Sequence, residues 1–514
     1  MRKIVKIIKK VMPQKMYLKI REKWMHLKLR KAVTLETQKI QENGIPESYE
    51  LIDPKKLISS NRLDIVVRYL LFKDFCNEVK NPENESLYAR TILYRTGAEE
   101  PVNEYSRAEK IGIDTHLDAA KKLYDGMKTN GFMKEYAIPI GINQGLFNGA
   151  HRLAAAIALD ERVWIDKRPD NGIADFCFDW FKDNDFSVND KIRIMRGFAD
   201  LYVKCGIFCI WATEKKNWDY ITKQIDKRVK VVAYADIDFS NNYIGFENII
   251  SDVYLNYNKD KSDNIQRKIE ILKMTDLVIR VVLVSDEGTD KSKDLYEIMG
   301  EIKREIREKL HYSLDKGSYL LMHGSDSYAE FCHLRNLLLS CNNIKFVNSR
   351  VHHIPRYEFV DKLHKLEQAL RKYKIPKSNV CIVSGGVLEA YGLRSSTDVD
   401  IIITSQLREQ YKSGSIEIGD EIEIHKENLY QVRDDVIIMD DNYHFYYLGF
   451  KFANLELEFD KKKKDFVCSE NAKTKRDIRL IQLYYDYSKY EKNQWELSRR
   501  ISNEMEIRKK KKWL

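Results

Sequence analysis

VSGGVLEAYGLRSSTDVDIII, residues 383–403, is the stretch that decides the fold of the C-terminal part of this chain. It begins at the end of an apolar run from Val380 to Val383, which predicts a short strand. Gly385 and Gly386 then open a helix, and without Cβ atoms they leave the backbone amides at its start accessible to a triphosphate. We therefore expect Ser384, Gly385 and Gly386 to form a phosphate-binding turn.

Two aspartates follow this turn after eleven intervening residues. Asp398 and Asp400 alternate with Val399 and Ile401, so a strand places both carboxylates on one face. Neighbouring carboxylates repel each other unless a cation lies between them, and metal-assisted phosphoryl or nucleotidyl transfer requires that arrangement. The pattern predicts a site for Mg²⁺ or Mn²⁺. The alternative is an exposed edge strand with two aspartates beside an ordinary Gly-Gly turn.

The combination resembles the DNA polymerase beta-like nucleotidyltransferase superfamily, in which such a turn precedes an Asp-x-Asp pair at similar spacing. The resemblance implies that Ser384, Gly385 and Gly386 bind the phosphates of an NTP and that Asp398 and Asp400 hold the metal. It also implies a third carboxylate from a neighbouring strand. The alternation in LELEF, residues 455–459, predicts that strand. Glu456 is the expected third ligand and catalytic carboxylate, and Glu458 is the reserve.

A second motif lies earlier in the chain, at residues 148–153, NGAHRL. Asn148 and Gly149 form a turn, and His151 and Arg152 lie at the start of an alanine-rich helix, where an anion is stabilised by the helix terminus. The motif resembles the ParB/sulfiredoxin fold over residues 50–165. The resemblance implies that Asn148, Gly149, His151 and Arg152 bind a nucleotide. The alternative is that His151 caps a buried helix and Arg152 forms an ion pair.

Sulfiredoxin-type reduction requires a cysteine in that motif, and position 150 is an alanine. ParB proteins that bind DNA carry a helix-turn-helix domain next, and the sequence of residues 166–350 does not indicate one. A nucleotide- or phosphate-binding module remains.

The charge is concentrated at the two ends of the chain. The net charge is +10, and residues 1–31 hold twelve Lys and Arg against one acid. Apolar residues recur there at helical spacing, which predicts a basic amphipathic helix that lies on an anionic membrane surface or packs on the protein with its lysines in water. There is no apolar run long enough to cross a bilayer and no secretory signal pattern. We expect a cytoplasmic protein, peripheral at the inner face of the membrane, with reduced cysteines.

These signals predict an α/β or α+β multidomain chain. The expected parts are a basic helical segment (1–35), a ParB/sulfiredoxin-like domain (50–165), an α/β domain (166–350) and a nucleotidyltransferase-type mixed sheet with helices (355–505). Within 166–350, residues 230–234, 277–284 and 344–347 read as strands.

This order of parts resembles bacterial proteins associated with surface-polysaccharide biosynthesis. The resemblance implies an Mg²⁺-dependent enzyme that transfers a nucleotidyl or phosphoryl group from an NTP to a sugar, a lipid-linked sugar or a small alcohol. Two alternatives remain. One is a ParB-like regulator that binds nucleic acid, and the other is a toxin-like nucleotidyltransferase that modifies protein or RNA.

Overall fold

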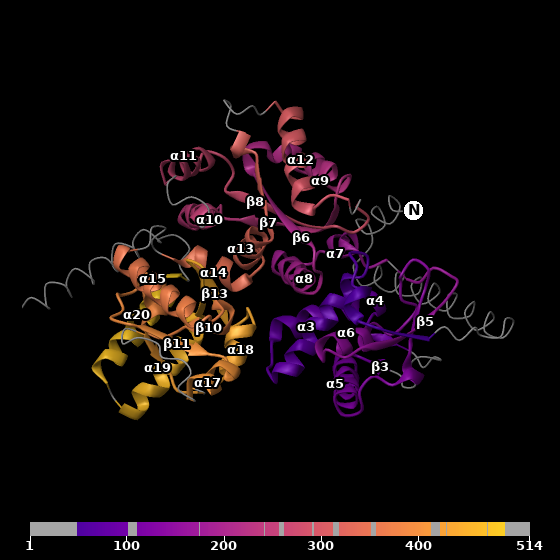
Figure 1. Cartoon of the computed structure of the whole chain (residues 1–514), viewed down its shortest axis with the longest axis horizontal. Coiled ribbons are helices and arrows are strands. Elements are labelled where there is room, and N and C mark those ends of the chain that lie inside the picture. Colours follow the sequence, from indigo (N-terminus) through magenta and orange to yellow (C-terminus); the bar gives the residue numbers. More distant parts are fainter. Residues whose placement is uncertain are drawn as a thin grey trace, which may run out of the picture. The chain divides into compact units, whose positions relative to one another are not determined.

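A computed structural model of the chain (Figure 1) divides into two units, residues 1–203 and 204–514. The structure describes residues 49–100, 110–173, 175–240, 242–255, 262–289, 292–311, 318–350, 356–412, 422–427, 429–469 and 471–488. The predicted basic helix at residues 1–31 and the basic C-terminal tail lie outside the described residues. The expected mixed α/β class is confirmed, since both units combine small sheets with many helices.

The first unit contains a three-stranded sheet in the order β1-β5-β4. β1 (Tyr49–Ile52) runs antiparallel to β5 (Val163–Lys167), and β4 (Ile138–Ile140) runs parallel to it. A two-stranded ribbon pairs β2 (Glu99–Glu100) with β3 (Lys110–Ile111). The helices of this unit are α3 (Leu63–Asn77), α4 (Pro82–Thr96), α5 (Ile113–Asn130), α6 (Ala150–Ala158), α7 (Phe178–Asp183) and α8 (Val188–Leu201).

The helix α3 is the core of the first unit, because ten of its 15 residues are buried. It packs against α6 and α8. The close approach of α8 depends on Gly197, where an added Cβ would lie 2.6 Å from Val66 Cγ1. Arg90 of α4 also forms an ion pair with Asp190 of α8 at 2.6 Å. The expected domain boundary at residue 165 therefore falls inside the first unit, which extends to the end of α8.

The second unit begins with a four-stranded antiparallel sheet in the order β7-β8-β6-β9. Its strands are β6 (Cys205–Trp211), β7 (Lys230–Asp238), β8 (Val278–Ser285) and β9 (Met322–Gly324). Every residue of β6 and β8 is buried, so both faces of the sheet are covered. The helices α9 (Trp218–Asp226) and α12 (Leu295–Lys309) cover one face. On the other face the ring of Trp211 lies near that of Tyr254 of α10 (Tyr243–Leu255). The two ring centroids are 6.4 Å apart.

The segment predicted as a strand at residues 344–347 is helical, and that prediction was wrong. It lies within α14 (Cys341–Ser349). The other helices of this part of the unit are α11 (Ser262–Leu272) and α13 (Tyr328–Leu338). Ser340 caps the start of α14 by accepting a hydrogen bond from the Asn343 amide at 3.2 Å. The segment fits a helix because Phe346 points from it toward the five-stranded sheet. The ring centroid of Phe346 lies 4.0 Å from that of Phe445.

A five-stranded mixed sheet completes the second unit, in the order β12-β11-β10-β14-β13. Its strands are β10 (Val380–Ile382), β11 (Val399–Ile403), β12 (Ile422–Ile424), β13 (His444–Tyr447) and β14 (Phe450–Ala453). The pairs β11–β12 and β10–β14 are parallel, and the other two pairs are antiparallel. The helices of this part are α15 (Tyr357–Lys372), α16 (Gly385–Ala390), α17 (Ser405–Lys412), α18 (Asp434–Met439), α19 (Leu455–Ser469) and α20 (Ala472–Ser488).

None of the helices in the described residues combines the length and the hydrophobicity that crossing a bilayer requires.

Candidate metal site on the second sheet

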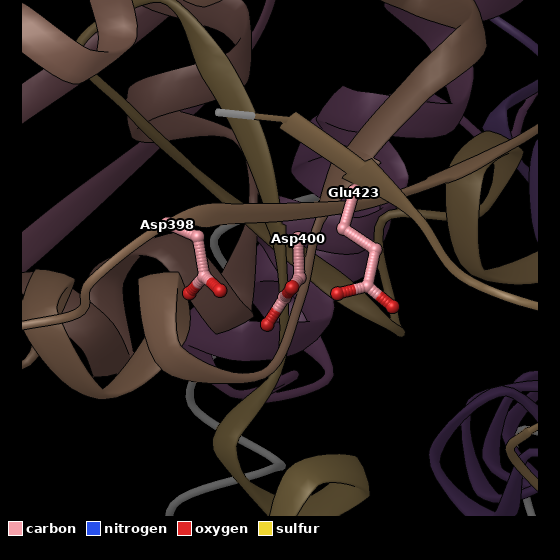
Figure 2. A group of neighbouring side chains, drawn as sticks. All are labelled: Asp398, Asp400 and Glu423. Carbon is pink, nitrogen blue, oxygen red and sulfur yellow. The ribbon is translucent and has the colours of Figure 1, made fainter. Parts of the chain in front are cut away.

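The strongest candidate site is a group of three carboxylates on the edge of the five-stranded sheet. Asp400 lies in β11, Asp398 is the residue directly before β11, and Glu423 lies in β12. Their ligand oxygens all lie within 4.8 Å of one another, and the three side chains point into the same space (Figure 2). The predicted pairing of Asp398 and Asp400 on one face of a strand agrees with this geometry.

The register between β11 and β12 explains why Glu423 joins the two aspartates. The strands are parallel, and Asp400 stands opposite Glu423. Residues directly opposite each other carry their side chains on the same face, and like charges in such a pair are destabilising. A divalent cation would remove this repulsion, and carboxylate oxygens are the ligands that Mg²⁺ and Mn²⁺ prefer. The three residues therefore fit a hard divalent cation.

Asp400 is the most buried of the three carboxylates, with a side chain that is only 13% exposed. Burial acts to raise its pKa, but the hydrogen bond from His425, the amide of Gly385 and the charge of Lys473 outweigh burial and lower it. The Nε2 atom of His425 lies 3.4 Å from Asp400 Oδ1. Asp400 is therefore ionised at neutral pH, which is the state that a cation ligand requires.

Ser384 lies between β10 and α16, and Gly385 and Gly386 are the first residues of α16, as predicted. Ser384 has a φ of 53°, which is unusual for a residue with a side chain. Gly386 is required by close packing, since an added Cβ would lie 2.5 Å from Ile382 Cγ2. The turn therefore has a fixed shape beside the carboxylates.

The amides of this turn already have partners within the protein. The Ser384 amide donates to Glu458 Oε1 at 2.6 Å, the Gly385 amide donates to Asp400, and the Gly386 amide donates to the Val383 carbonyl at 3.2 Å. The turn thus orients Asp400 directly. That these three residues bind phosphates stays a prediction, and the amides would contact a phosphate only by giving up these bonds.

Glu456 and Glu458 do not lie on a strand, and that part of the prediction was wrong. Residues 455–469 form α19, which starts where the Asn454 side chain accepts a hydrogen bond from the Leu457 amide at 3.0 Å. Glu456 is half-exposed and forms an ion pair with Lys345 at 2.8 Å. It is not part of the carboxylate group described above.

Glu458, the reserve candidate, is fully buried under the Ser384 turn. Its Oε1 atom accepts the Ser384 amide and also the hydroxyl of Tyr430. This carboxylate therefore holds the turn in its unusual conformation and takes no place among the three acidic ligands.

Buried ion pairs fix the loop that leads from α16 to Asp398. Arg394 donates two hydrogen bonds to Asp477 of α20, at 2.7 and 2.9 Å, and Lys462 of α19 lies 3.0 Å from the same carboxylate. Burial acts to raise the pKa of Asp477, but Arg394 and Lys462 together lower it. At the other side of the loop, Glu389 accepts the amide of Ser396 at 2.7 Å. Both ends of the loop are thereby attached to helices.

Glu423 is the site residue that reasoning from the sequence missed. The signal was present, because EIEIH at residues 421–425 alternates acidic and apolar residues as DVDI does at 398–401. Its alternation predicts a strand with Glu423 and His425 nearby along one edge. The alternation at residues 455–459 carries larger apolar residues and therefore predicted Glu456 in place of Glu423.

The second predicted motif lies in the first unit, at the start of α6. Asn148 Oδ1 accepts the amide of Gly149 at 2.6 Å, and Gly149 has a φ of 91°. The His151 Nε2 atom lies 2.9 Å from the Tyr88 hydroxyl. Arg152 donates to the carbonyls of the segment that leads into β4. The described contacts of His151 and Arg152 thus brace the fold of this unit.

A buried cluster of cationic side chains lies beside His151. Arg62 and Arg68 share the carboxylate of Asp64, and all three side chains are almost completely buried. Burial, Arg68 and Arg95 together keep the pKa of His151 well below its usual value, so its ring is neutral. Among the described residues, no acceptor reaches the Nε and Nη2 atoms of Arg68. Two buried guanidinium groups against one carboxylate leave this cluster positively charged.

No family model, curated protein or solved structure matches this chain. The assignment of chemistry therefore depends on the geometry of the sites. Three convergent carboxylates on adjacent strands can bind a divalent cation, and a bound cation can neutralise phosphate oxygens and lower the pKa of an attacking hydroxyl.

Proposed function

We propose that the chain is an Mg²⁺- or Mn²⁺-dependent transferase that moves a nucleotidyl or phosphoryl group from an NTP to a hydroxyl acceptor. The observation that carries the proposal is that Asp400 stands opposite Glu423 on the neighbouring strand. The ligand oxygens of these two residues and of Asp398 all lie within 4.8 Å of one another. A mixed sheet with a fixed turn beside the acids is also compatible with the nucleotidyltransferase resemblance of the sequence. The acceptor that this resemblance implies is a sugar, a lipid-linked sugar or a small alcohol, in surface-polysaccharide biosynthesis.

The residues of the site have separate tasks under this proposal. Asp398, Asp400 and Glu423 would hold the cation, which when bound supplies charge neutralisation at the transferred phosphorus. Gly385 donates its amide to Asp400 and so fixes the direction of one ligand. Lys473, at the exposed start of α20, adds positive charge close enough to influence Asp400 and is suited to contact a phosphate oxygen.

Calorimetry tests the site. ATP, CTP, GTP and UTP are titrated with Mg²⁺ into the wild type, into Asp398→Asn/Asp400→Asn and into the matched control Glu456→Gln. We expect one or more NTPs to bind, with loss of the Mg²⁺-dependent binding in the double variant and no change in Glu456→Gln. Equal binding by the wild type and the double variant would show that the carboxylates do not serve a nucleotide.

The cationic cluster of the first unit supports a second candidate, a phosphate or nucleotide site near His151. Its specific support is Arg68, which is fully buried and has two donor atoms that no described acceptor reaches. Leaving such donors unpaired costs about 1–3 kcal/mol, which a bound phosphate would offset. Loss of NTP binding in Arg68→Gln, together with its retention in Asp398→Asn/Asp400→Asn, would assign the nucleotide to this unit. It would favour the ParB-like regulator.

A further inference from the structure

A cavity of about 350 Å³ lies in the second unit between α13 and the β13–β14 hairpin. Lys377 and Ser378 form part of its wall, immediately before β10 begins at Val380. The Ser384 turn and the carboxylates lie at the other end of β10. The cavity is therefore a separate place in the fold, which the proposed transfer reaction does not use.

The wall of the cavity has an excess of positive charge. Three cationic side chains line it, each from a different element: Arg335 of α13, Lys377 before β10 and Lys451 of β14. Among the described residues of the wall, Asp252 is the one with an acidic side chain. It forms an almost completely buried ion pair with Arg350 at 3.1 Å, and Arg350 is not a lining residue. Arg350 thus neutralises this acid, as Glu367 neutralises Lys377, and the lining side chains comprise three cations against one acid.

Lys451 is fixed in position although it is nearly buried, with 9% of its surface exposed. Its ammonium group donates to the carbonyls of Ser378 at 2.8 Å and Ile438 at 2.6 Å. Lys377 is held by Glu367 at 2.9 Å. These contacts fix both ammonium groups at the wall of the cavity.

The remaining wall fits an organic group. Tyr446 and Tyr447 line the cavity, and the turn at Leu448 and Gly449 closes it with two left-handed residues, at φ 50° and 79°. Burial lowers the pKa of His333, and its Nε2 atom lies 2.8 Å from the Asp252 carbonyl, so a neutral ring adds polar surface. The volume lies at the lower end of the range of small-molecule sites, which is roughly 300–1,000 Å³.

We propose that this cavity binds a small phosphomonoester, with the phosphate against Arg335, Lys377 and Lys451 and one ring against Tyr446. A sugar phosphate and a nucleoside monophosphate share this chemistry. The full chain is therefore titrated in EDTA with glucose 1-phosphate, AMP and inorganic phosphate. We expect saturable binding of at least one ester, tighter than that of inorganic phosphate. Equal binding of all three compounds, or binding of none, would overturn the proposal.

Variants and a thiol probe locate the binding. Arg335→Gln and Lys377→Gln should each weaken the ester at least tenfold, whereas Asp398→Asn/Asp400→Asn and the exposed control Lys372→Gln should not. Cys332 lines the cavity, so bound ester should slow its alkylation, while that of the exposed Cys468 stays unchanged. The alkylation assay uses the wild type and does not depend on how the variants fold. Unchanged affinity in both cavity variants, or an unprotected Cys332 at saturation, would refute the site.

Discussion

Replacing Glu423 by Gln should change the stability of this protein in opposite directions with and without a divalent cation. In EDTA, the substitution removes a negative charge that stands opposite Asp400, within 4.8 Å between ligand oxygens. Two unit charges at that distance repel by about 1 kcal/mol in water and by about 3.5 kcal/mol at an effective dielectric constant near 20. Glu423 is exposed, so the lower value applies, and the variant should be about 1 kcal/mol more stable.

With Mg²⁺ present the order should reverse. A cation at one hundred times its Kd stabilises the wild type by about 2.7 kcal/mol, and the variant, which lacks one of three ligands, loses most of that gain. The assay is urea unfolding in EDTA and in Mg²⁺, with Glu456→Gln as the control. Glu456→Gln should respond to Mg²⁺ as the wild type does. A Glu423→Gln variant that is less stable in EDTA, or that responds fully to Mg²⁺, would refute the assignment.

Three further predictions concern the surroundings of the sites. Gly386→Ala should lower stability by about 1–3 kcal/mol, because its Cβ would lie 2.5 Å from Ile382, and Gly385→Ala should cost less, as thermal melting of both variants will show. Asp477→Asn should destabilise the protein at pH 7. The folded pKa of Asp477 is lowered, so its contribution is present above its unfolded pKa and is lost as the pH falls through the folded value. The difference from the wild type should therefore shrink in urea unfolding at acidic pH, and a constant difference would contradict this. His151 should stay neutral well below pH 6.5, and an NMR titration with a normal imidazole pKa would show that its ring is not buried among cations.

The strand that places Asp398 and Asp400 side by side was predictable because its sequence pattern is local. Alternation of acidic and apolar residues puts both aspartates on one face whatever the strand pairs with. Apolar periodicity likewise predicts helices at residues 357–373 and at about 474–488, and α15 and α20 lie within two residues of these bounds. The third carboxylate was not predictable in this way, because its position depends on which strand lies beside β11.

Two errors have the same physical origin. Residues 344–347 and 455–459 are both short segments in which apolar residues alternate with or flank charged ones, a pattern that fits a strand and also one turn of a helix. The deciding residues precede each run, since Ser340 and Asn454 cap the first turns of α14 and α19. The contact of Phe346 with Phe445 also joins elements far apart in the sequence, and no local pattern contains it.

The position of β12 at the edge of its sheet has a consequence for how the metal site would assemble. Among the described strands, β12 pairs with β11 alone, through three register pairs. Edge segments detach at a lower free energy than central strands, so the third ligand is present only in the fraction of molecules in which β12 is attached. The apparent metal affinity is reduced by that fraction, and a bound cation in turn holds the strand in place. The His425 amide, directly after β12, donates to the Ile401 carbonyl of β11 at 2.9 Å, so its hydrogen exchange would slow as Mg²⁺ is added and would report the occupancy of the metal site.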